Sequence, residues 1–400
     1  MTRRFGIAER RARLGARHHL APGWHGETPT QVADSLIGLH ATDPASVYLA
    51  ARARLADGAT SVVEHALYQR RSLVRMLAMR RTMWVTPTAL APVLQAGATA
   101  AVARRMRARL VAELARGGVG GDDSAAWLAD LETAVLVALT RRGAATGAQL
   151  SADEPLLRTQ LTYAEDKSYG GPVAITSRVL NLMSAEARIV RGRPRGSWVS
   201  SQYEWWPASA WWPDSRPEWA TESAQAELVS RYLTAFGPAT AADLKWWTGW
   251  TMREVRQALS AHQVVEVDLE VGPGQTQTGL LLESDAEHTP QPDPWVALLP
   301  ALDPTAMGWT ARDWYLPAEH RPALFDRSGN VAPTVWWCGQ VVGGWGQRTN
   351  GEVVFTLLED PGAEATAAVE VEAGKLTEWL AGVRVTPRFR TPLEKELAAW

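Results

Sequence analysis

The chain has 400 residues, 46% of them hydrophobic, and this length exceeds the size at which one hydrophobic core keeps growing, so we expect two to four domains. The formal net charge of −2 argues against a surface that is basic throughout, as a nonspecific nucleic-acid binder would have. The single cysteine, Cys338, excludes an internal disulfide and cysteine-based metal clusters, and it suits the reducing cytoplasm in which we expect the protein to act. The basic N-terminal segment lacks a continuous apolar core, so we expect neither a secretory signal nor a membrane span.

The first predicted unit consists of three helices and a hairpin. The helices are predicted at about 29–38, 43–56 and 60–71, and the hairpin at 73–79 and 83–86, with its turn at Arg80 and Arg81. Asp43 followed by Pro44 is a strong helix start, because Asp accepts unpaired amide hydrogens and Pro is tolerated in the first turn. His40 and Thr42 therefore lie in a short connection between two helices. An imidazole and a hydroxyl at this spacing can face the same small space and hold a water molecule or a polar ligand.

An internal repeat indicates two further units. GAATGAQL at 143–150 aligns with GPATAADL at 237–244, and each follows an amphipathic segment and precedes more helical sequence. A pair of candidate strands then follows each copy, the first pair at 188–190 and 197–203 with its turn at 191–196, the second beginning at 264–269 with its turn at 272–274. Helix, short helix, helix and a two-stranded wing is the winged helix-turn-helix order. An unrelated helical bundle is the alternative.

The composition changes after a candidate linker at 285–294. The segments WVALLP, PTVWWCGQVVGGW, EVVFTLL and AAVEVEA are predicted strands, and 374–382 and 391–400 are predicted helices. Such spacing is typical of a small β-barrel or a curved sheet. We therefore predict an α+β protein with three tandem winged helix-turn-helix modules followed by a C-terminal β-barrel-like domain. The predicted boundaries are 1–120, 121–210, 211–290 and 291–400.

Arginines gather in clusters that can form one basic face on a neutral body, as a protein that binds a phosphate backbone requires. The candidate phosphate contacts are Arg80 and Arg81 at the tip of the first wing and Arg191, Arg193 and Arg195 at the tip of the second. Solvated surface arginine with no ligand is the alternative explanation.

Three motifs resemble the winged-helix DNA glycosylases of the AlkZ and YcaQ type. They are GLHATDPASVYLAARAR at 38–54, LLPALDPTAMGW at 298–309 and LFDRSGNVAPTVWWCGQVVGGW at 324–345, and the similarity extends over nearly the whole chain. The catalytic motif of that family is two polar residues flanking one apolar residue, usually Gln-apolar-Gln or Gln-apolar-Asp. The matching triplet here is His40-Ala41-Thr42, so His and Thr replace the two polar residues.

The resemblance implies a monofunctional DNA glycosylase that hydrolyses the N-glycosidic bond of N7-alkylated guanine and leaves an abasic site. It makes His40 and Thr42 the catalytic candidates, positioning a water at C1′, and it suggests bulky natural-product adducts and antibiotic self-resistance. Asp43 can stabilise the sugar cation, although its role as a helix cap explains it more simply. Among the 20 tryptophans, most of which we expect in the core, Trp309 and Trp345 lie in the family-like motifs and are candidates for stacking on DNA.

The implied partner is double-stranded DNA that contains an alkylated purine, with no metal or organic cofactor, and tandem modules permit a working monomer. A lyase step would need a positioned amine, and the only lysines are Lys167, Lys245, Lys375 and Lys395. The departure from the family triplet leaves one alternative open, a non-catalytic tandem winged-helix DNA-binding protein that acts as a regulator or a lesion binder.

Overall fold

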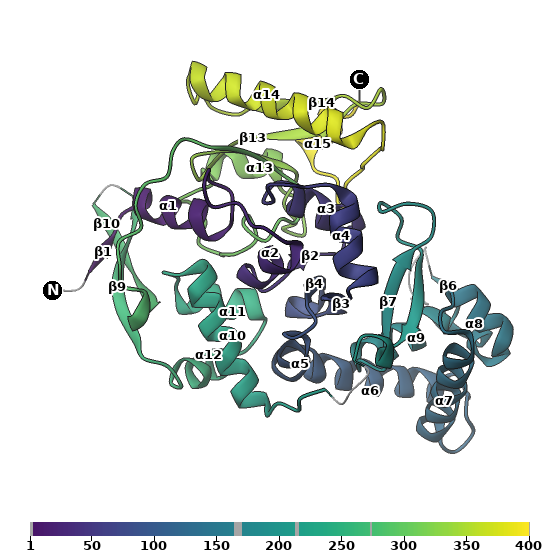
Figure 1. The fold of residues 1–400 in the computed structure, drawn as a ribbon. Helices are drawn as coiled ribbons and strands as arrows, with labels where there is room; N and C mark the ends of the chain where they lie inside the picture. The colour runs from purple at the N-terminus through teal and green to yellow at the C-terminus, as the bar shows by residue number, and fades with distance from the viewer. Residues whose placement is uncertain (1–2, 164–169, 213–215, 273, 400) are drawn as a thin grey trace.

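The computed structural model describes residues 3–163, 170–212, 216–272 and 274–399 (Figure 1). Helices alternate with five small sheets in this part of the chain, and none of these sheets is closed. The α+β class is therefore confirmed. No helix among the described residues is long and apolar enough to cross a membrane.

The first unit contains the predicted helices and hairpin, with one extra strand. Its elements are α2 (Pro29–Ser35), β2 (Leu39–His40), α3 (Pro44–Arg52), α4 (Thr60–Glu64) with a π-helical turn at His65–Gln69, β3 (Leu73–Leu77) and β4 (Met83–Pro87). The three strands form a sheet in the order β2-β4-β3. Thr28 and Asp43 cap α2 and α3 with their side chains, and a proline follows each cap. The short strand β2 places His40 in the sheet and not in a free connection.

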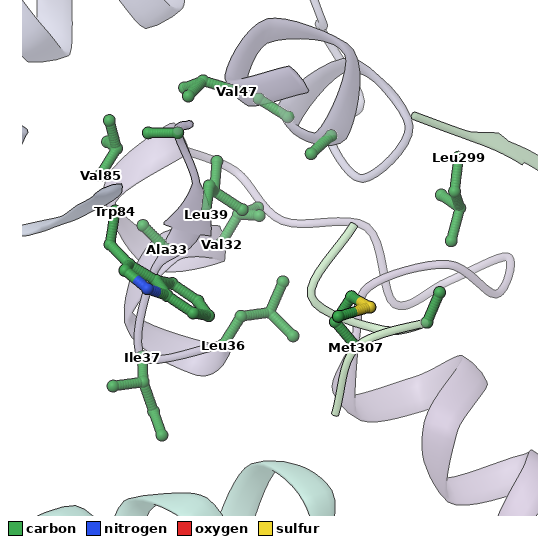
Figure 2. Packing of buried hydrophobic residues seen from close by; sticks show 14 of the residues in the cluster. Val32, Ala33, Leu36, Ile37, Leu39, Val47, Trp84, Val85, Leu299 and Met307 are labelled. Atoms are coloured by element: carbon green, nitrogen blue, oxygen red, sulfur yellow. The ribbon is translucent and has the colours of Figure 1, made fainter. Parts of the chain in front are cut away.

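Figure 2 shows how the core holds this sheet. Leu39 lies beside Val32 of α2, and Trp84 of β4 covers the same helix, while Leu299 and Met307 approach from the C-terminal part of the chain. Buried apolar packing therefore fixes the sheet that holds His40.

The second unit has its own apolar core, which extends from the end of α6 to β8. The helix α5 (Ala91–Leu94) packs in the larger core and continues through a π-helical turn at Gln95–Thr99 into α6 (Ala100–Arg116), whose end enters the second core. The remaining elements of the second unit are α7 (Ser124–Arg142), α8 (Gly147–Asp153), β5 (Gln160–Tyr163), β6 (Gly171–Ala174), α9 (Thr176–Ala185), β7 (Ile189–Pro194) and β8 (Tyr203–Pro207).

The predicted turn at 191–196 is wrong, because β7 continues through Pro194 and β8 begins only at Tyr203. Gly192 allows the indole of Trp206 to pack against the backbone, since a Cβ there would lie 2.4 Å from the ring. The ladder shifts register between Arg191 and Pro194, which is where a proline is tolerated in a strand. Gly and Pro here mark a close approach and a bulge, and not the predicted turn.

The third unit contains α10 (Thr221–Phe236), α11 (Ala241–Thr248), α12 (Met252–Leu259), β9 (Val264–Gly272) and β10 (Gln275–Leu282). The N-terminal strand β1 (Arg4–Phe5) pairs in parallel with β9, and α1 (Ile7–Arg17) follows it. The sequence repeat has a physical basis in helix capping, because Thr146 and Thr240 each form a capping box, with Gln149 and Asp243 respectively.

The C-terminal part is an open four-stranded sheet with helices packed on it. The strands are β11 (Val296–Leu299), β12 (Thr334–Trp337), β13 (Gln340–Gln347) and β14 (Val353–Leu357), in the order β11-β12-β13-β14, and the helices are α13 (Arg321–Leu324), α14 (Ala363–Leu380) and α15 (Pro392–Leu397). In Figure 1, α14 lies along the sheet at the edge of the molecule farthest from α7. The barrel is not confirmed by this sheet, and the three winged-helix modules and the domain boundaries stay predictions.

The predicted strand AAVEVEA is wrong, because residues 367–373 lie inside α14. The buried residues of α14 include Ala365, Val369 and Ala373, which are four apart and share one helix face. Val371, which the alternating pattern would bury, is 58% exposed. The apolar residues of AAVEVEA alternate with a period of two, but the longer period of four that sets the buried face of α14 determines the structure.

Candidate active site

All three residues of the triplet His40-Ala41-Thr42 pair with residues of β4. His40 lies opposite Trp84, and the amide of Ala41 donates to the carbonyl of Met83 at 2.7 Å. The Oγ1 atom of Thr42 then accepts a hydrogen bond from the amide of Met83 at 3.3 Å, in the place where a backbone carbonyl would continue the ladder. The hydroxyl hydrogen of Thr42 has no acceptor among the described residues. The Thr42 side chain is therefore fixed but still able to donate.

Thr42 lines a cavity of about 630 Å³. The cavity lies between the start of α3, the starts of α8 and α9, and the β7–β8 hairpin. The lining residues are Ala41, Thr42, Pro44, Thr146, Gly147, Ala148, Thr176, Ser177, Leu180, Asn181, Arg191, Arg195, Ser201, Gln202, Tyr203, Trp205 and Arg388. The set includes arginines, hydroxyls and amides but no carboxylate.

His40 does not line this cavity. Its ring is 2% exposed and lies 5.3 Å from the ring of Trp84, measured between centroids. Burial, followed by the charge of Arg80, lowers the pKa of His40 to about 3, so the imidazole is neutral at physiological pH. Its Nδ1 atom is buried and has no hydrogen-bond partner among the described residues. The structure thus places Thr42 at the cavity and His40 behind it.

Asp43 is the N-cap of α3. Its Oδ1 atom accepts from the amide of Ala45 and its Oδ2 atom accepts from the amide of Arg388, each at 3.1 Å. Burial raises the pKa of Asp43, and these backbone hydrogen bonds act in the opposite direction. Asp43 does not line the cavity. Its contacts support the capping role, and they also join the triplet to a segment 345 residues away.

The arginines of the β7–β8 hairpin point in two directions. Arg191 and Arg195 line the cavity, and Arg191 donates to Asn181 at 2.8 Å. Arg193 lies outside the cavity, where it pairs with Glu64 at 2.8 Å and covers the ring of Tyr68. Strand alternation alone would place Arg191 and Arg193 on the same face, and the bulge between Arg191 and Pro194 accounts for their different directions.

Arg80 and Arg81 occupy the turn of the first hairpin, and neither lines the cavity. Both have positive φ angles, 52° and 62°, in the left-handed region. The guanidinium of Arg80 lies 4.0 Å from the ring centre of Trp246, and burial followed by the charge of Arg312 lowers its pKa to about 10. Arg81 is exposed. The structure therefore does not bring the two arginine clusters together in one cavity.

Trp309 and Trp345 are core residues, each 3% exposed. Their indole N–H groups donate to the carbonyls of Phe236 at 3.0 Å and Leu299 at 2.8 Å. A ring in this position offers no free face to a base, so we correct the suggested stacking role to a packing role.

Arg388 is a cavity residue that the sequence analysis missed. It is exposed and follows the last strand by 31 residues in the segment RVTPRFR, whose alternating arginines are the one signal in the sequence. Its backbone is held by Asp43, so only the folded chain shows its position.

The described residues contain no group of three or more His, Cys, Asp or Glu side chains that could hold a metal ion. Lys245, Lys375 and Lys395 do not line the cavity, and Lys167 lies outside the described residues.

Comparisons with known proteins identify the family. The family model described as DNA glycosylase AlkZ-like matches residues 33–379. The fold is similar to that of Streptomyces sahachiroi DNA glycosylase AlkZ, with a TM-score of 0.71 and 21% sequence identity over 96% of this chain and 99% of that chain. No curated protein matches the chain. At 21% identity the structural likeness shows the fold, whereas the family model spans most of the chain. The chain therefore belongs to the AlkZ-like family of DNA glycosylases.

Proposed function

We propose that this protein is a monofunctional glycosylase that hydrolyses the N-glycosidic bond of N7-alkylated guanine in double-stranded DNA and leaves an abasic site. One observation carries the proposal. Thr42, the last residue of the triplet that corresponds to the family's catalytic motif, lines a cavity of about 630 Å³ whose charged side chains are all arginines. Such a cavity attracts an anionic polymer and presents a hydroxyl to the part of it that enters.

The chemistry requires little from the side chains. An N7-alkylated guanine is cationic, so the base leaves with the electron pair of its bond to C1′ and becomes neutral. Water then adds to C1′ and releases a proton to solvent. The protein has to position that water and to avoid placing a positive charge beside the oxocarbenium-like sugar. Thr42 can hold the water with its free hydroxyl hydrogen and remaining lone pair.

His40 has the second catalytic position in the proposal. Because its pKa is lowered to about 3, it adds no charge that would oppose the sugar cation. Its buried Nδ1 atom, which has no partner among the described residues, is free to orient a polar group that enters from the site. We thus give the two residues separate roles. Thr42 contacts the water, and His40 orients a polar group of the site.

The size of the cavity supports bulky substrates. A volume of about 630 Å³ is in the range that holds drug-sized ligands, so the cavity has room for a base with a large substituent. Self-resistance against a DNA-alkylating natural product is the biological role that this substrate class suggests. The described lysines do not line the cavity, which favours hydrolysis without a lyase step.

The test is base release from duplex DNA. The protein is incubated with duplexes that carry either N7-methylguanine or a bulky N7 adduct, and free base and alkali-labile sites are measured separately. We expect free base together with strands that break only after alkali treatment. Strand cleavage without alkali would contradict the monofunctional assignment.

His40→Ala and Thr42→Ala are the control variants, and we expect both to release base more slowly than the wild type. Undiminished release by both variants would remove the catalytic assignment of the triplet. Tight binding of every adduct with no release would favour the non-catalytic DNA-binding alternative, for which the absence of both usual triplet residues is the supporting observation.

A further inference from the structure

Two arginines of the β7–β8 hairpin and one from a distant segment line the cavity beside Thr42. Arg191 belongs to β7, Arg195 to the loop after it, and Arg388 to the segment between α14 and α15. None of them forms an ion pair within 4.0 Å in the part of the chain that the structure describes. The guanidinium of Arg191 lies 5.7 Å from the ring centre of Tyr203 and 5.3 Å from that of Trp205. It donates a hydrogen bond to the neutral side-chain amide of Asn181.

Neighbouring arginines that do not line the cavity are paired. Arg188, directly before β7, pairs with Glu132 at 2.6 Å, and Arg193 pairs with Glu64 at 2.8 Å. These two neighbours thus have carboxylate partners, whereas the three arginines inside the cavity form no ion pair among the described residues, and only the charge of Arg388 acts on a carboxylate, that of Asp43. Several arginines that line one cavity without a carboxylate among the lining residues are typical of an anion-binding site.

Neighbouring cations destabilise the charged form of Arg191. Arg75 is 2% exposed, and its guanidinium lies 4.8 Å from the ring centre of Tyr203, the ring that Arg191 also contacts. Burial is the largest cause that lowers the pKa of Arg191 to about 10, and the charges of Arg75 and Arg388 act in the same direction. An anion in the cavity would relieve this repulsion.

Neutral donors complete the cavity wall. Asn181 and Gln202 line it, and the helix α9 begins there with Thr176 and Ser177, so its first amides add positive potential. Asp43 fixes the backbone of Arg388 through its Oδ2 atom, which sets the third arginine relative to the triplet.

We infer that Arg191, Arg195 and Arg388 form a clamp for a phosphodiester group of the DNA strand, next to Thr42. The inference deepens the proposed function and rests on DNA being the substrate. Three cations and several neutral donors fit a phosphate oxygen cluster, and a backbone phosphate held beside the triplet would position the neighbouring C1′. Asp43 is a positioning residue for the clamp, because it holds Arg388 and contacts no ligand itself.

The test is the affinity of the full-length protein for an undamaged duplex, measured by fluorescence anisotropy at several salt concentrations. Arg191→Ala, Arg195→Ala and Arg388→Ala should each weaken binding on the order of tenfold, as for a lost hydrogen bond to a charged group. Each should also reduce the slope of log affinity against log salt by about 1. Arg191→Lys keeps the charge and should retain most of the slope.

Arg188→Ala is the matched control. It removes an arginine that lies directly before β7 and is paired with Glu132, and Arg107 still pairs with Glu132 in the variant. Equal weakening by Arg188→Ala, or unchanged slopes in all three clamp variants, would overturn the clamp. Free phosphate carries the same chemistry as a backbone phosphodiester, so chloride is exchanged for inorganic phosphate at constant ionic strength to separate these two ligands. We expect the duplex to stay bound, and its displacement by millimolar phosphate would overturn the DNA backbone as the ligand.

The affinity measurement uses an undamaged duplex and needs no base release. A negative result for the clamp can therefore be distinguished from a negative result for the proposed glycosylase activity. Intact clamp behaviour without release from any adduct would support the clamp and contradict the glycosylase proposal. Release of base by clamp variants with wild-type affinity and slope would contradict the clamp alone.

Discussion

His40 is held as a neutral imidazole by its surroundings. It is buried against Trp84, and the nearby charge of Arg80 disfavours a second positive charge. A glutamine, the usual residue of the family at this position, is neutral at every pH, whereas a histidine is neutral only when its environment lowers the pKa. Burial in the β2–β4 pair supplies that environment here.

The rate of base release should therefore show no inflection from His40 between pH 5 and 8. The folded pKa of about 3 lies below this window, so the imidazole stays neutral throughout. The measurement is single-turnover release against pH for the wild type and His40→Asn. A fall in the wild-type rate near pH 6.5 that is absent in His40→Asn would contradict a neutral His40.

The same shift predicts a loss of stability in acid. An unfolded histidine takes up a proton near pH 6.5 and the folded one only near pH 3, so the contribution of His40 is complete above pH 6.5 and falls as the pH is lowered. At pH 5 this linkage costs about 2 kcal/mol. Urea unfolding at pH 5 and 7.5 should show a smaller pH-dependent loss in His40→Asn. Equal losses in both proteins would disprove the linkage, since buried His18 contributes alike to both.

At the scale of elements, Asp43 joins the start of α3 to the segment that carries Arg388. Asp43→Ala removes the acceptor for both amides and should lower the free energy of unfolding by about 1 to 2 kcal/mol, as lost caps do. Asp43→Asn keeps one acceptor oxygen and should lose less. The melting temperatures of the wild type, Asp43→Ala and Asp43→Asn are compared by thermal unfolding. An Asp43→Ala variant as stable as the wild type would show that the cap is dispensable.

Elements with strong end signals were predictable from the sequence. Thr-x-x-Gln and Thr-x-x-Asp mark α8 and α11, and Asp43-Pro44 marks α3, because these side chains act on amides two or three residues away. The extension of β7 and the helical state of AAVEVEA were not predictable in this way. They depend on Trp206 packing on Gly192 and on the face of α14 that is buried by distant strands.

The candidate site was predictable only where it is local. The sequence identified Thr42, Arg191 and Arg195, all of which line the cavity, but it could not place His40 behind the cavity or Arg388 within it. Arg388 reaches the triplet across 345 residues, and no periodicity reports contacts of that range.

At the scale of the whole molecule, the family-like segment at 298–309 acts as a structural junction. Asp303 and Thr305 accept hydrogen bonds from Arg54 at 2.6 and 2.8 Å, and the ring of His18 bonds to Thr305 and to the carbonyl of Ala235. This fully buried network joins the ends of α1 and α3 to α10 and to the C-terminal part.

Breaking the Arg54–Asp303 pair should therefore affect the entire fold. Asp303→Ala leaves the guanidinium of Arg54 buried without its carboxylate and should lower the free energy of unfolding by about 3 to 5 kcal/mol. The double variant Arg54→Met with Asp303→Leu removes both charges and should lose less. Urea unfolding followed by fluorescence makes the comparison, and a milder effect of Asp303→Ala than of the double variant would contradict the junction's electrostatic basis.

The central claim is that the hydroxyl of Thr42 positions the attacking water. The most direct test is the single-turnover rate of base release from an N7-methylguanine duplex by wild type, Thr42→Ser and Thr42→Val, with melting temperatures confirming that all three fold. We expect Thr42→Ser to stay within a few-fold of the wild type and Thr42→Val, which has the same shape without the hydroxyl, to be slower on the order of a hundredfold. A Thr42→Val variant as fast as the wild type would contradict the claim.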